Sequence, residues 1–182
     1  MYVPNKPYFC GMKHNTRNLI LGLFIVLALY NIVQVLMRHG YLNANKIAIE
    51  QLPITDLNGT PIDWAKYRDK PLLINFWATW CGPCRNEKKH LLAAQEILAP
   101  EGWFFAMISD EEIGKLQAFA QQNPQITINS WHLQQSRKLS RVFEIPHTYI
   151  INRKGEIVHT HTGLNNWDSP ENIALLKSLV SQ

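Results

Sequence analysis

The sequence contains few cysteines and only one C-x-x-C pair. Only three cysteines occur among 182 residues, which excludes a small fold held together by many disulfides. A structural zinc site commonly uses four ligands supplied by two cysteine pairs, whereas this chain has a single C-x-x-C pair. There is no C-x-x-C-H motif for haem attachment either, because Arg85 follows Cys84. Internal repeats and low-complexity segments are also lacking.

Acidic residues are missing from the first part of the chain, and this makes its charge uneven. No Asp or Glu occurs before Glu50, and the net charge of +4 is accounted for by Lys6, Lys13, Arg17 and Arg38. The residues after Arg38 carry 14 basic and 14 acidic side chains, so they are neutral by formal count. The basic character therefore points to membrane topology and gives no support to nucleic-acid binding.

Residues 19–37 form a run of 19 residues without a charge. A helix of this length, at about 1.5 Å per residue, just spans a hydrocarbon core of about 30 Å. A cleaved signal peptide is the alternative, but the following Arg38 to Leu42 is a poor cleavage site. A buried core helix is disfavoured because the run has no amphipathic period. We therefore expect an uncleaved transmembrane anchor over residues 19–38.

The basic residues around this predicted anchor indicate its orientation. Those before it outnumber those after it, and the positive-inside rule then places the tail 1–18 in the cytoplasm. The linker 39–46 and a domain over 47–182 would lie outside, which for a bacterial cell means a periplasmic or extracytoplasmic domain on the inner membrane. Cys10, in the tail, is expected to be a free thiol, with lipidation as an alternative.

The segment Cys81-Gly82-Pro83-Cys84 follows the apolar, strand-like run Leu72 to Trp77 and precedes a helix-like stretch. A C-x-x-C between a strand and a helix indicates a redox dithiol. Two intervening residues allow the sulfurs to bridge when the second cysteine lies in the first helical turn. The helix N-terminus favours the Cys81 thiolate, and Pro83 fits just inside a helix start. Metal binding and a purely structural disulfide are the weaker alternatives.

Strand-like and helix-like segments alternate along the rest of the chain, which predicts an α/β domain. The expected elements are a hairpin over Ile54–Ile62 with an Asn58-Gly59 turn, a short helix Trp64–Tyr67 capped by Asp63, a helix from Cys84 to about Leu98, a strand Trp103–Ile108, a helix Glu111–Gln122, a weak strand Ile126–Ile128, a short basic helix Ser136–Phe143, a hairpin of Thr148–Ile151 and Ile157–Thr162, and a last helix from Pro170 to Val180 capped by Ser169.

The motif Trp80-Cys81-Gly82-Pro83-Cys84 resembles the active site of thioredoxins. The longer frame from Asn75 to Glu87 is more similar to the membrane-anchored TlpA/ResA/CcmG branch of that superfamily. The resemblance covers about Ile47 to Val180. It implies a thioredoxin fold, with a central mixed β-sheet flanked by helices on both faces and an N-terminal β-hairpin extension, preceded here by one transmembrane helix.

The resemblance also implies roles for individual residues. Cys81 would be the exposed attacking thiol and Cys84 the shielded resolving thiol. Ile145-Pro146 matches the cis-proline whose loop faces the dithiol and pairs with the substrate backbone. Trp80 would either shield the dithiol or pack in the core. The residues expected to contact substrate are Trp80, Gly82, Pro83, Ile145 and His147.

Asn75 and Glu87 decide whether a side chain near the dithiol can exchange protons with the cysteines. Asn75 stands where thioredoxin proper has a buried Asp, and an amide cannot titrate. Glu87 lies one helical turn after Cys84, so a partly buried carboxylate there would have a raised pKa and act in proton exchange. The alternative is a solvated Glu87 that pairs with Lys88 or Arg85. Lys89 stands where the family often has a helix-kinking proline, so a straighter helix is expected.

Three histidines are candidate functional residues. His147, after the predicted cis-proline, should lie near the sulfurs, where it would line the groove, stabilise a thiolate or join Cys81 and Cys84 as a copper(I) ligand. His159 and His161 share one face of a strand and are expected to face solvent, with a metal site as the alternative.

The sequence as a whole predicts an extracytoplasmic thiol–disulfide oxidoreductase that reduces client disulfides through Cys81 and Cys84. The resemblance implies clients in cytochrome c or copper-centre maturation and a membrane dithiol donor of the DsbD/CcdA kind. No cofactor beyond the redox-active disulfide is expected. The alternatives are a disulfide oxidase or isomerase of the same fold, and a copper chaperone that uses Cys81, Cys84 and His147.

Overall fold

The computed structural model describes residues 22–34, 49–124 and 128–180, and the chain divides into two units, Met1–Asn45 and Lys46–Gln182. In the first unit residues 22–34 are helical and their side chains are exposed. None of the helices within the described ranges is long and apolar enough to cross a membrane. The predicted tail with Cys10, the two ends of the predicted anchor and the linker lie outside the described residues.

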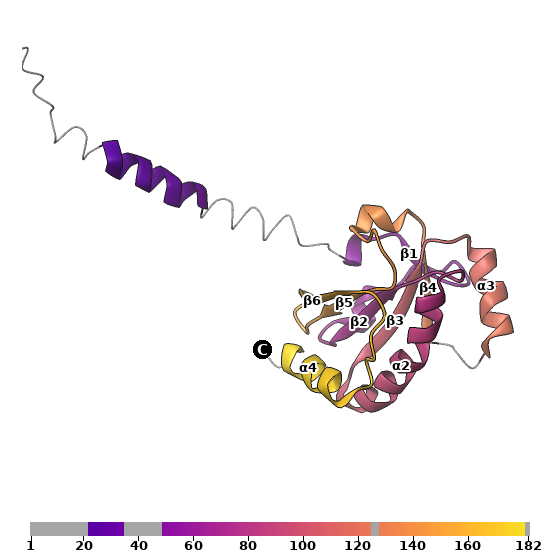
Figure 1. The fold of residues 1–182 in the computed structure, drawn as a ribbon. Coiled ribbons are helices and arrows are strands. Elements are labelled where there is room, and N and C mark those ends of the chain that lie inside the picture. The colour runs from indigo at the N-terminus through magenta and orange to yellow at the C-terminus, as the bar shows by residue number, and fades with distance from the viewer. Residues whose placement is uncertain (1–21, 35–48, 125–127, 181–182) are drawn as a thin grey trace, which may run out of the picture. The chain divides into compact units, whose positions relative to one another are not determined.

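The second unit is built on a mixed sheet of six strands in the order β1-β4-β3-β2-β5-β6 (Figure 1). The parallel strands β2, β3 and β4 form its centre, whereas β1 pairs antiparallel with β4, β5 with β2, and β6 with β5. Their bounds are β1 Ile54–Asp56, β2 Leu72–Phe76, β3 Phe104–Ser109, β4 Asn129–Leu133, β5 His147–Ile151 and β6 Ile157–Thr162. This arrangement confirms the predicted thioredoxin-like α/β fold.

Strand β2 lies at the centre because all five of its residues are apolar or can be satisfied in the core. Each of them is buried, as expected of a strand covered on both faces. The alternation of side chains sends Leu73 and Asn75 to one face and Leu72, Ile74 and Phe76 to the other. The strand ends next to the C-x-x-C segment, so the middle of the sheet positions the two cysteines.

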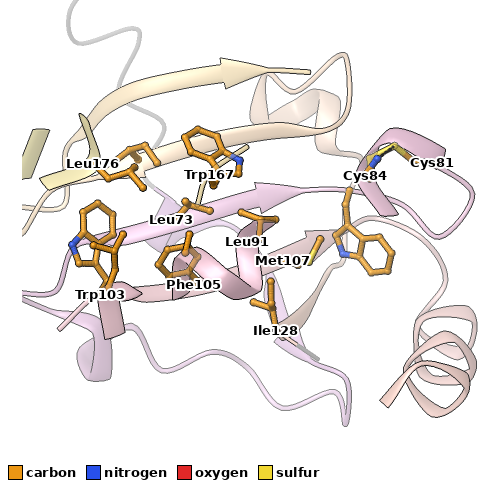
Figure 2. Close-up of a cluster of buried hydrophobic side chains, with 14 of the residues drawn as sticks. Leu73, Cys81, Cys84, Leu91, Trp103, Phe105, Met107, Ile128, Trp167 and Leu176 are labelled. Carbon is orange, nitrogen blue, oxygen red and sulfur yellow. Dashed lines mark hydrogen bonds between the residues drawn. A yellow bond between two sulfur atoms is a disulfide. The ribbon is translucent and has the colours of Figure 1, made fainter. Parts of the chain in front are cut away.

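Each face of the sheet has its own core. The first, which includes Leu91, Leu116 and Leu176, is formed against the three α-helices α2 Gly82–Leu98, α3 Ile113–Gln122 and α4 Pro170–Val180. Figure 2 shows labelled side chains of this core, which come from the sheet, from α2, from α4 and from the segment with Trp167. The second core packs against short 3-10 helices and loops: η1 Ile49–Gln51, η2 Trp64–Tyr67 and η5 Arg137–Ser140, while η3 Ala99–Glu101 continues α2. The helices that cover the second face are thus 3-10 turns.

Several predicted helix starts are confirmed by their capping bonds. The Asp63 carboxylate accepts a hydrogen bond from the Ala65 N–H at 3.1 Å. The Ser169 hydroxyl accepts one from the Asn172 N–H at 3.2 Å, at the start of α4. These bonds satisfy N–H groups that have no partner inside the helix.

Three predicted elements differ in the structure. The strand predicted at Ile126–Ile128 begins later, as β4, and residues 125–127 lie outside the described ranges. The predicted basic helix over Ser136–Phe143 is only the four-residue η5. The hairpin over Ile54–Ile62 is reduced to one bridge, between Thr55 and Pro61, because β1 forms its ladder with β4 instead.

The turn of that short hairpin uses one glycine and one carboxylate. Gly59 has a φ of 84°, and Asn58, which was expected to share the left-handed conformation, does not have a positive φ. The Asp56 carboxylate instead accepts hydrogen bonds from the N–H groups of Asn58 and Thr60, both at 2.8 Å. An Asx-type side-chain bond therefore replaces the second positive φ angle.

Candidate active site

Cys81 and Cys84 form a disulfide at the N-terminus of α2, with Cα atoms 5.3 Å apart. Cys81 is the N-cap of the helix, and its Sγ accepts a hydrogen bond from the Cys84 N–H at 3.2 Å. Pro83 lies in the first turn, where its missing N–H leaves no bond unmade. The predicted position of the two cysteines, between a central strand and a helix, is confirmed.

The disulfide is less exposed than the sequence suggested. Cys84 is fully buried, and Cys81 is only 5% exposed. The Cys81 Sγ lies 3.9 Å from the carbonyl oxygen of Ile145, which precedes a cis peptide bond to Pro146. The Pro146 carbonyl in turn accepts a hydrogen bond from the Gly163 N–H at 2.8 Å. The cis-proline loop is therefore where the resemblance implied, beside the attacking cysteine, and it covers that cysteine in the oxidised state.

The other residues of the motif lie at the surface. Trp80 is 65% exposed, so its alternative role as a core residue is wrong. Gly82 is half-buried and Pro83 is exposed. An exposed indole next to a dithiol offers apolar area to a partner chain, and contact of these residues with substrate stays a prediction.

Glu87 is completely buried, which excludes the alternative of a solvated surface carboxylate. Its Oε1 accepts hydrogen bonds from the Trp167 indole N–H at 2.8 Å and the Asn165 backbone N–H at 3.1 Å. Its Oε2 accepts one from the Asn75 side-chain amide at 3.0 Å. His90, on the next turn of α2, contacts Asp168 at 2.7 Å, so the loop carrying Trp167 is joined to α2 at two points.

Burial raises the pKa of Glu87, and the three donors together with the nearby His90 offset only part of that rise. A carboxyl group whose pKa moves toward neutrality can both accept and return a proton near physiological pH. Because Glu87 lies one turn after Cys84 on the same helix, this supports the acid–base role predicted for it from the sequence.

Asn75 connects Glu87 to the neighbouring strand β5. Its amide N–H₂ donates both to Glu87 and to the Thr148 hydroxyl, at 2.9 Å, while its own carbonyl oxygen has no partner. A half-turn of the amide would let that oxygen accept from a protonated Glu87 and from Thr148. Asn75 cannot titrate, but it can serve Glu87 in either protonation state.

His147 does not point where the sequence suggested. It lies opposite Phe76 in the sheet, and its ring packs edge-on against Tyr149, a residue of the second core, with centroids 4.8 Å apart. Its Nδ1 shares a hydrogen bond with the Thr162 hydroxyl at 2.8 Å. Burial, and secondarily His161, lowers the pKa of His147. The imidazole therefore favours the neutral form, which weakens the expectation that it acts as a cation beside the sulfurs.

His159 and His161, which are expected from the sequence to face solvent, are both half-buried. His161 lies edge-on against Trp167, with ring centroids 5.5 Å apart. Among the described residues no group of three or more His, Cys, Asp and Glu side chains is arranged to hold a metal ion.

Sequence reasoning missed two residues of this site, Trp167 and Lys88. Trp167 is fully buried, and it is 80 positions from the carboxylate that it contacts. Lys88 is only 2% exposed, and its ammonium nitrogen lies 3.7 Å from the centre of the Trp77 ring and 4.6 Å from that of Phe119. A signal for Lys88 was present, because it falls on the apolar stripe that runs from Cys84 to Leu91 at helical spacing.

A family model described as Redoxin matches residues 43–176. The chain belongs to the Redoxin family. The ResA thiol-disulfide oxidoreductase of Geobacillus kaustophilus is 29% identical over 113 residues, which cover 60% of this chain and 64% of that protein. A thiol:disulfide interchange protein DsbE of Yersinia pestis is 55% identical over 42 residues, which cover 21% of this chain and 22% of that one.

Solved structures agree with this Redoxin fold. A secreted Mycobacterium tuberculosis disulfide oxidoreductase, described as homologous to E. coli DsbE, superposes with a TM-score of 0.56 at 19% identity and covers 69% of this chain and 96% of that one. At that identity the likeness shows the fold alone. The thiol–disulfide oxidoreductase chemistry expected from the sequence is the chemistry named for the matched Redoxin relatives.

Proposed function

We propose that this Redoxin chain is a thiol–disulfide oxidoreductase of the ResA/DsbE type that reduces disulfides in client proteins outside the cytoplasm. The single observation that carries the proposal is the Cys81–Cys84 disulfide at the N-terminus of α2, beside the cis-proline loop. Its clients would belong to cytochrome c or copper-centre maturation, as the sequence resemblance implies. The two cysteines are the only redox group that this chemistry requires.

The reaction is a two-electron exchange in which sulfur–sulfur bonds are swapped. The Cys81 thiolate attacks a client disulfide, forming a mixed disulfide and releasing one client sulfur as a thiolate. Cys84 then gives up its proton and attacks the Cys81 sulfur, which releases the second client sulfur and forms the Cys81–Cys84 disulfide. Glu87 is the group one turn away that would accept the Cys84 proton. The client gains two electrons and this chain loses two.

Glu87 also supports the reductive direction. A buried carboxylate near the dithiol disfavours a second negative charge on sulfur, which raises the pKa of the thiols and favours the disulfide over the reduced form. A pair that is more stable as the disulfide is a better electron donor. The runner-up, an oxidase or isomerase of the same fold, would instead need a strongly stabilised thiolate.

Location and electron supply are part of the proposal. The uncharged run 19–37 with its basic flank supports a membrane anchor over residues 19–38, with the tail 1–18 in the cytoplasm and the domain 47–182 outside. A reductant in that position needs electrons from inside the cell. We therefore propose a membrane dithiol donor of the DsbD/CcdA kind as its partner. Copper(I) chaperone activity has no supporting ligand geometry in the described residues.

The test is an equilibrium redox titration of the full chain in detergent micelles, with Cys10→Ser so that only one dithiol responds. The reduced fraction is read by alkylation and mass spectrometry across a series of dithiothreitol ratios. A potential close to or below that of thioredoxin, about −270 mV, supports an electron donor. A potential near that of strong oxidants, about −120 mV, would show that the direction is the reverse of the one proposed.

Trapped intermediates give the second arm of the test. In a Cys84→Ser variant, the mixed disulfide between Cys81 and a client cannot be resolved and accumulates. We expect the trapped clients to be proteins whose cysteines are oxidised when they arrive. Cys81→Ser is the matched control and should trap none. Clients that arrive with free thiols would support the oxidase alternative.

A further inference from the structure

Glu87 and Lys88 are the only charged residues among the buried side chains of the described ranges. They are neighbours in the sequence and both lie on α2, close after Cys84. With 3.6 residues per turn, Glu87 lies about 60° to one side of Cys84 around the helix, and Lys88 about 40° to the other. The resolving cysteine therefore lies between an acidic and a basic position around the helix.

The ammonium group of Lys88 is held by two aromatic rings. Its nitrogen lies 3.7 Å from the centre of the Trp77 ring and 4.6 Å from that of Phe119, within the range of a cation–π interaction. Trp77 belongs to the same core cluster as Cys81 and Cys84. The two rings, themselves packed edge-on with centroids 5.2 Å apart, thus fix the cation in the layer that contains the disulfide.

No carboxylate offsets this charge. Within the described ranges the Lys88 ammonium takes part in neither a salt bridge nor a side-chain hydrogen bond, and its neighbour Glu87 faces Trp167 and Asn75 instead. Burial accordingly lowers the pKa of Lys88 to about 8, so the side chain is still mostly charged at pH 7. Taking most of a lysine side chain out of water without a paired carboxylate is costly, and a hydrophobic side chain of similar length would fill the same space.

We propose that Lys88 is a positioning residue that tunes the reduction potential of the dithiol. Its positive charge stabilises the cysteine thiolate, so the chain is a weaker reductant than it would be with Glu87 as the only charge near the pair. The inference rests on the proposed function, because it concerns the same cysteines. A cation near a thiol lowers the thiol pKa. Stabilising the reduced form raises the reduction potential of the pair. Glu87 and Lys88 would then act on the potential in opposite directions.

The test compares Lys88→Met with the parent chain in the redox titration described above. Met keeps the length and apolar stem but removes the charge. We expect the equilibrium with the reference couple to shift about tenfold toward the disulfide, equivalent to about 30 mV more reducing. The pKa of the Cys81 thiol, read from thiolate absorbance, should rise. Neither quantity responds to a purely structural role.

Three matched variants sharpen the result. Lys88→Arg keeps the charge and should restore both quantities toward the parent values. Lys89→Met removes an exposed positive charge from the same helix and should change the equilibrium less than twofold, because solvent screens it. Lys88→Gln is a second neutral variant, for use if Lys88→Met does not fold.

The inference is overturned if the neutral variants stay within twofold of the parent, or if Lys89→Met shifts the equilibrium as much as they do. Failure of the proposed function looks different. An oxidising parent chain would reverse the direction of electron flow and leave the difference between the parent and Lys88→Met intact. A reducing parent chain with an unchanged Lys88→Met would remove only the inference.

Discussion

The two sides of α2 treat buried charge in different ways. On one side Glu87 receives three hydrogen bonds, from Trp167, Asn165 and Asn75. On the other side the Lys88 ammonium lies over two aromatic rings and, within the described ranges, makes no side-chain hydrogen bond. Both groups lose hydration on folding, but only the anion regains directional donors in exchange. The same helix therefore carries an anion whose hydrogen bonds offset part of its burial cost and a cation without such bonds.

Because of this difference, we expect replacement of Glu87 by Ala and of Lys88 by Met to change the free energy of unfolding in opposite directions. Removing the supported group leaves unsatisfied donors behind, which destabilises a fold. Removing the unsupported group relieves a desolvation cost and leaves nothing unpaired. Four substitutions test this contrast, in order of decreasing expected effect.

Glu87→Ala should have the largest effect. It leaves the N–H groups of Trp167, Asn165 and Asn75 without an acceptor and opens a cavity, so we expect the free energy of unfolding to fall by about 3 to 4 kcal/mol at pH 7. Urea denaturation followed by far-UV circular dichroism measures the change. Glu87→Gln is the control, because its carbonyl still accepts two of the bonds, and it should stay near the parent. Equal losses in both variants would contradict the role of the hydrogen bonds.

The raised pKa of Glu87 determines in which direction this group changes the stability of the parent chain with pH. Its folded pKa is raised, so the folded state holds the proton more tightly than the unfolded state. The stability associated with this group is therefore present below the unfolded pKa, about 4.3, and is lost as pH rises through the folded value. Glu87→Gln should abolish this part of the pH profile.

Lys88→Met should have the second largest effect and the opposite sign. Lowering the pKa from 10.5 to about 8 corresponds to at most about 3.5 kcal/mol, at about 1.4 kcal/mol per pKa unit. The variant should therefore be more stable than the parent at pH 7, by about 2 kcal/mol. Since the folded parent releases its proton first, its stability rises between about pH 8 and 10.4, and the gap should close there. A gap that stays constant with pH would mean that packing, not charge, is responsible.

Trp167→Phe removes one donor to Glu87 and keeps most of the ring. The ionised carboxyl loses a hydrogen bond of about 1 kcal/mol, so the pKa of Glu87 should rise further. Carbon-detected NMR of the glutamate carboxyls during a pH titration measures it. His161→Phe, which preserves an edge-on ring against Trp167, is the control and should leave the titration in place. An unchanged Glu87 titration in Trp167→Phe would remove Trp167 from the carboxyl network.

Phe119→Leu should have the smallest effect. It removes the more distant of the two rings and a cation–π interaction of about 0.5 to 1 kcal/mol, so the pKa of Lys88 should fall by less than one unit. Nitrogen NMR of the lysine side chains measures this value. A rise in the Lys88 pKa would show that the ring contributes mainly desolvation.

The dithiol and its position could be predicted from the sequence because they depend on local rules. The spacing of Cys81 and Cys84, Pro83 at the helix start and the apolar strand before them lie within a few residues of one another. The cis bond at Pro146 followed from the family resemblance and the partly buried Glu87 from its position one helical turn after Cys84; the bond is cis, and Glu87 is completely buried. The partners of Glu87 could not be predicted, because Trp167 and Asn165 reach it from about 80 positions away.

His147 and β4 show two other limits of sequence reasoning. The position of His147 next to the cis-proline was predicted, but its direction depends on the pleat of β5, in which Thr148 faces Asn75 and His147 faces Tyr149. The start of β4 was misplaced because a short apolar run does not reveal which strand it will pair with. The buried Lys88 was overlooked since a lysine is almost never fully buried without a partner.

The cover over the Cys81 sulfur affects how the chain would handle electrons over time. In the oxidised chain only 5% of Cys81 is exposed, so small thiols in the surroundings rarely reach the sulfur, and exchange rates fall with access. A protein partner that engages the cis-proline loop would not face the same barrier. The disulfide would then be reduced slowly by small thiols and quickly by a docked donor, so selectivity at this step is kinetic, whatever the driving force.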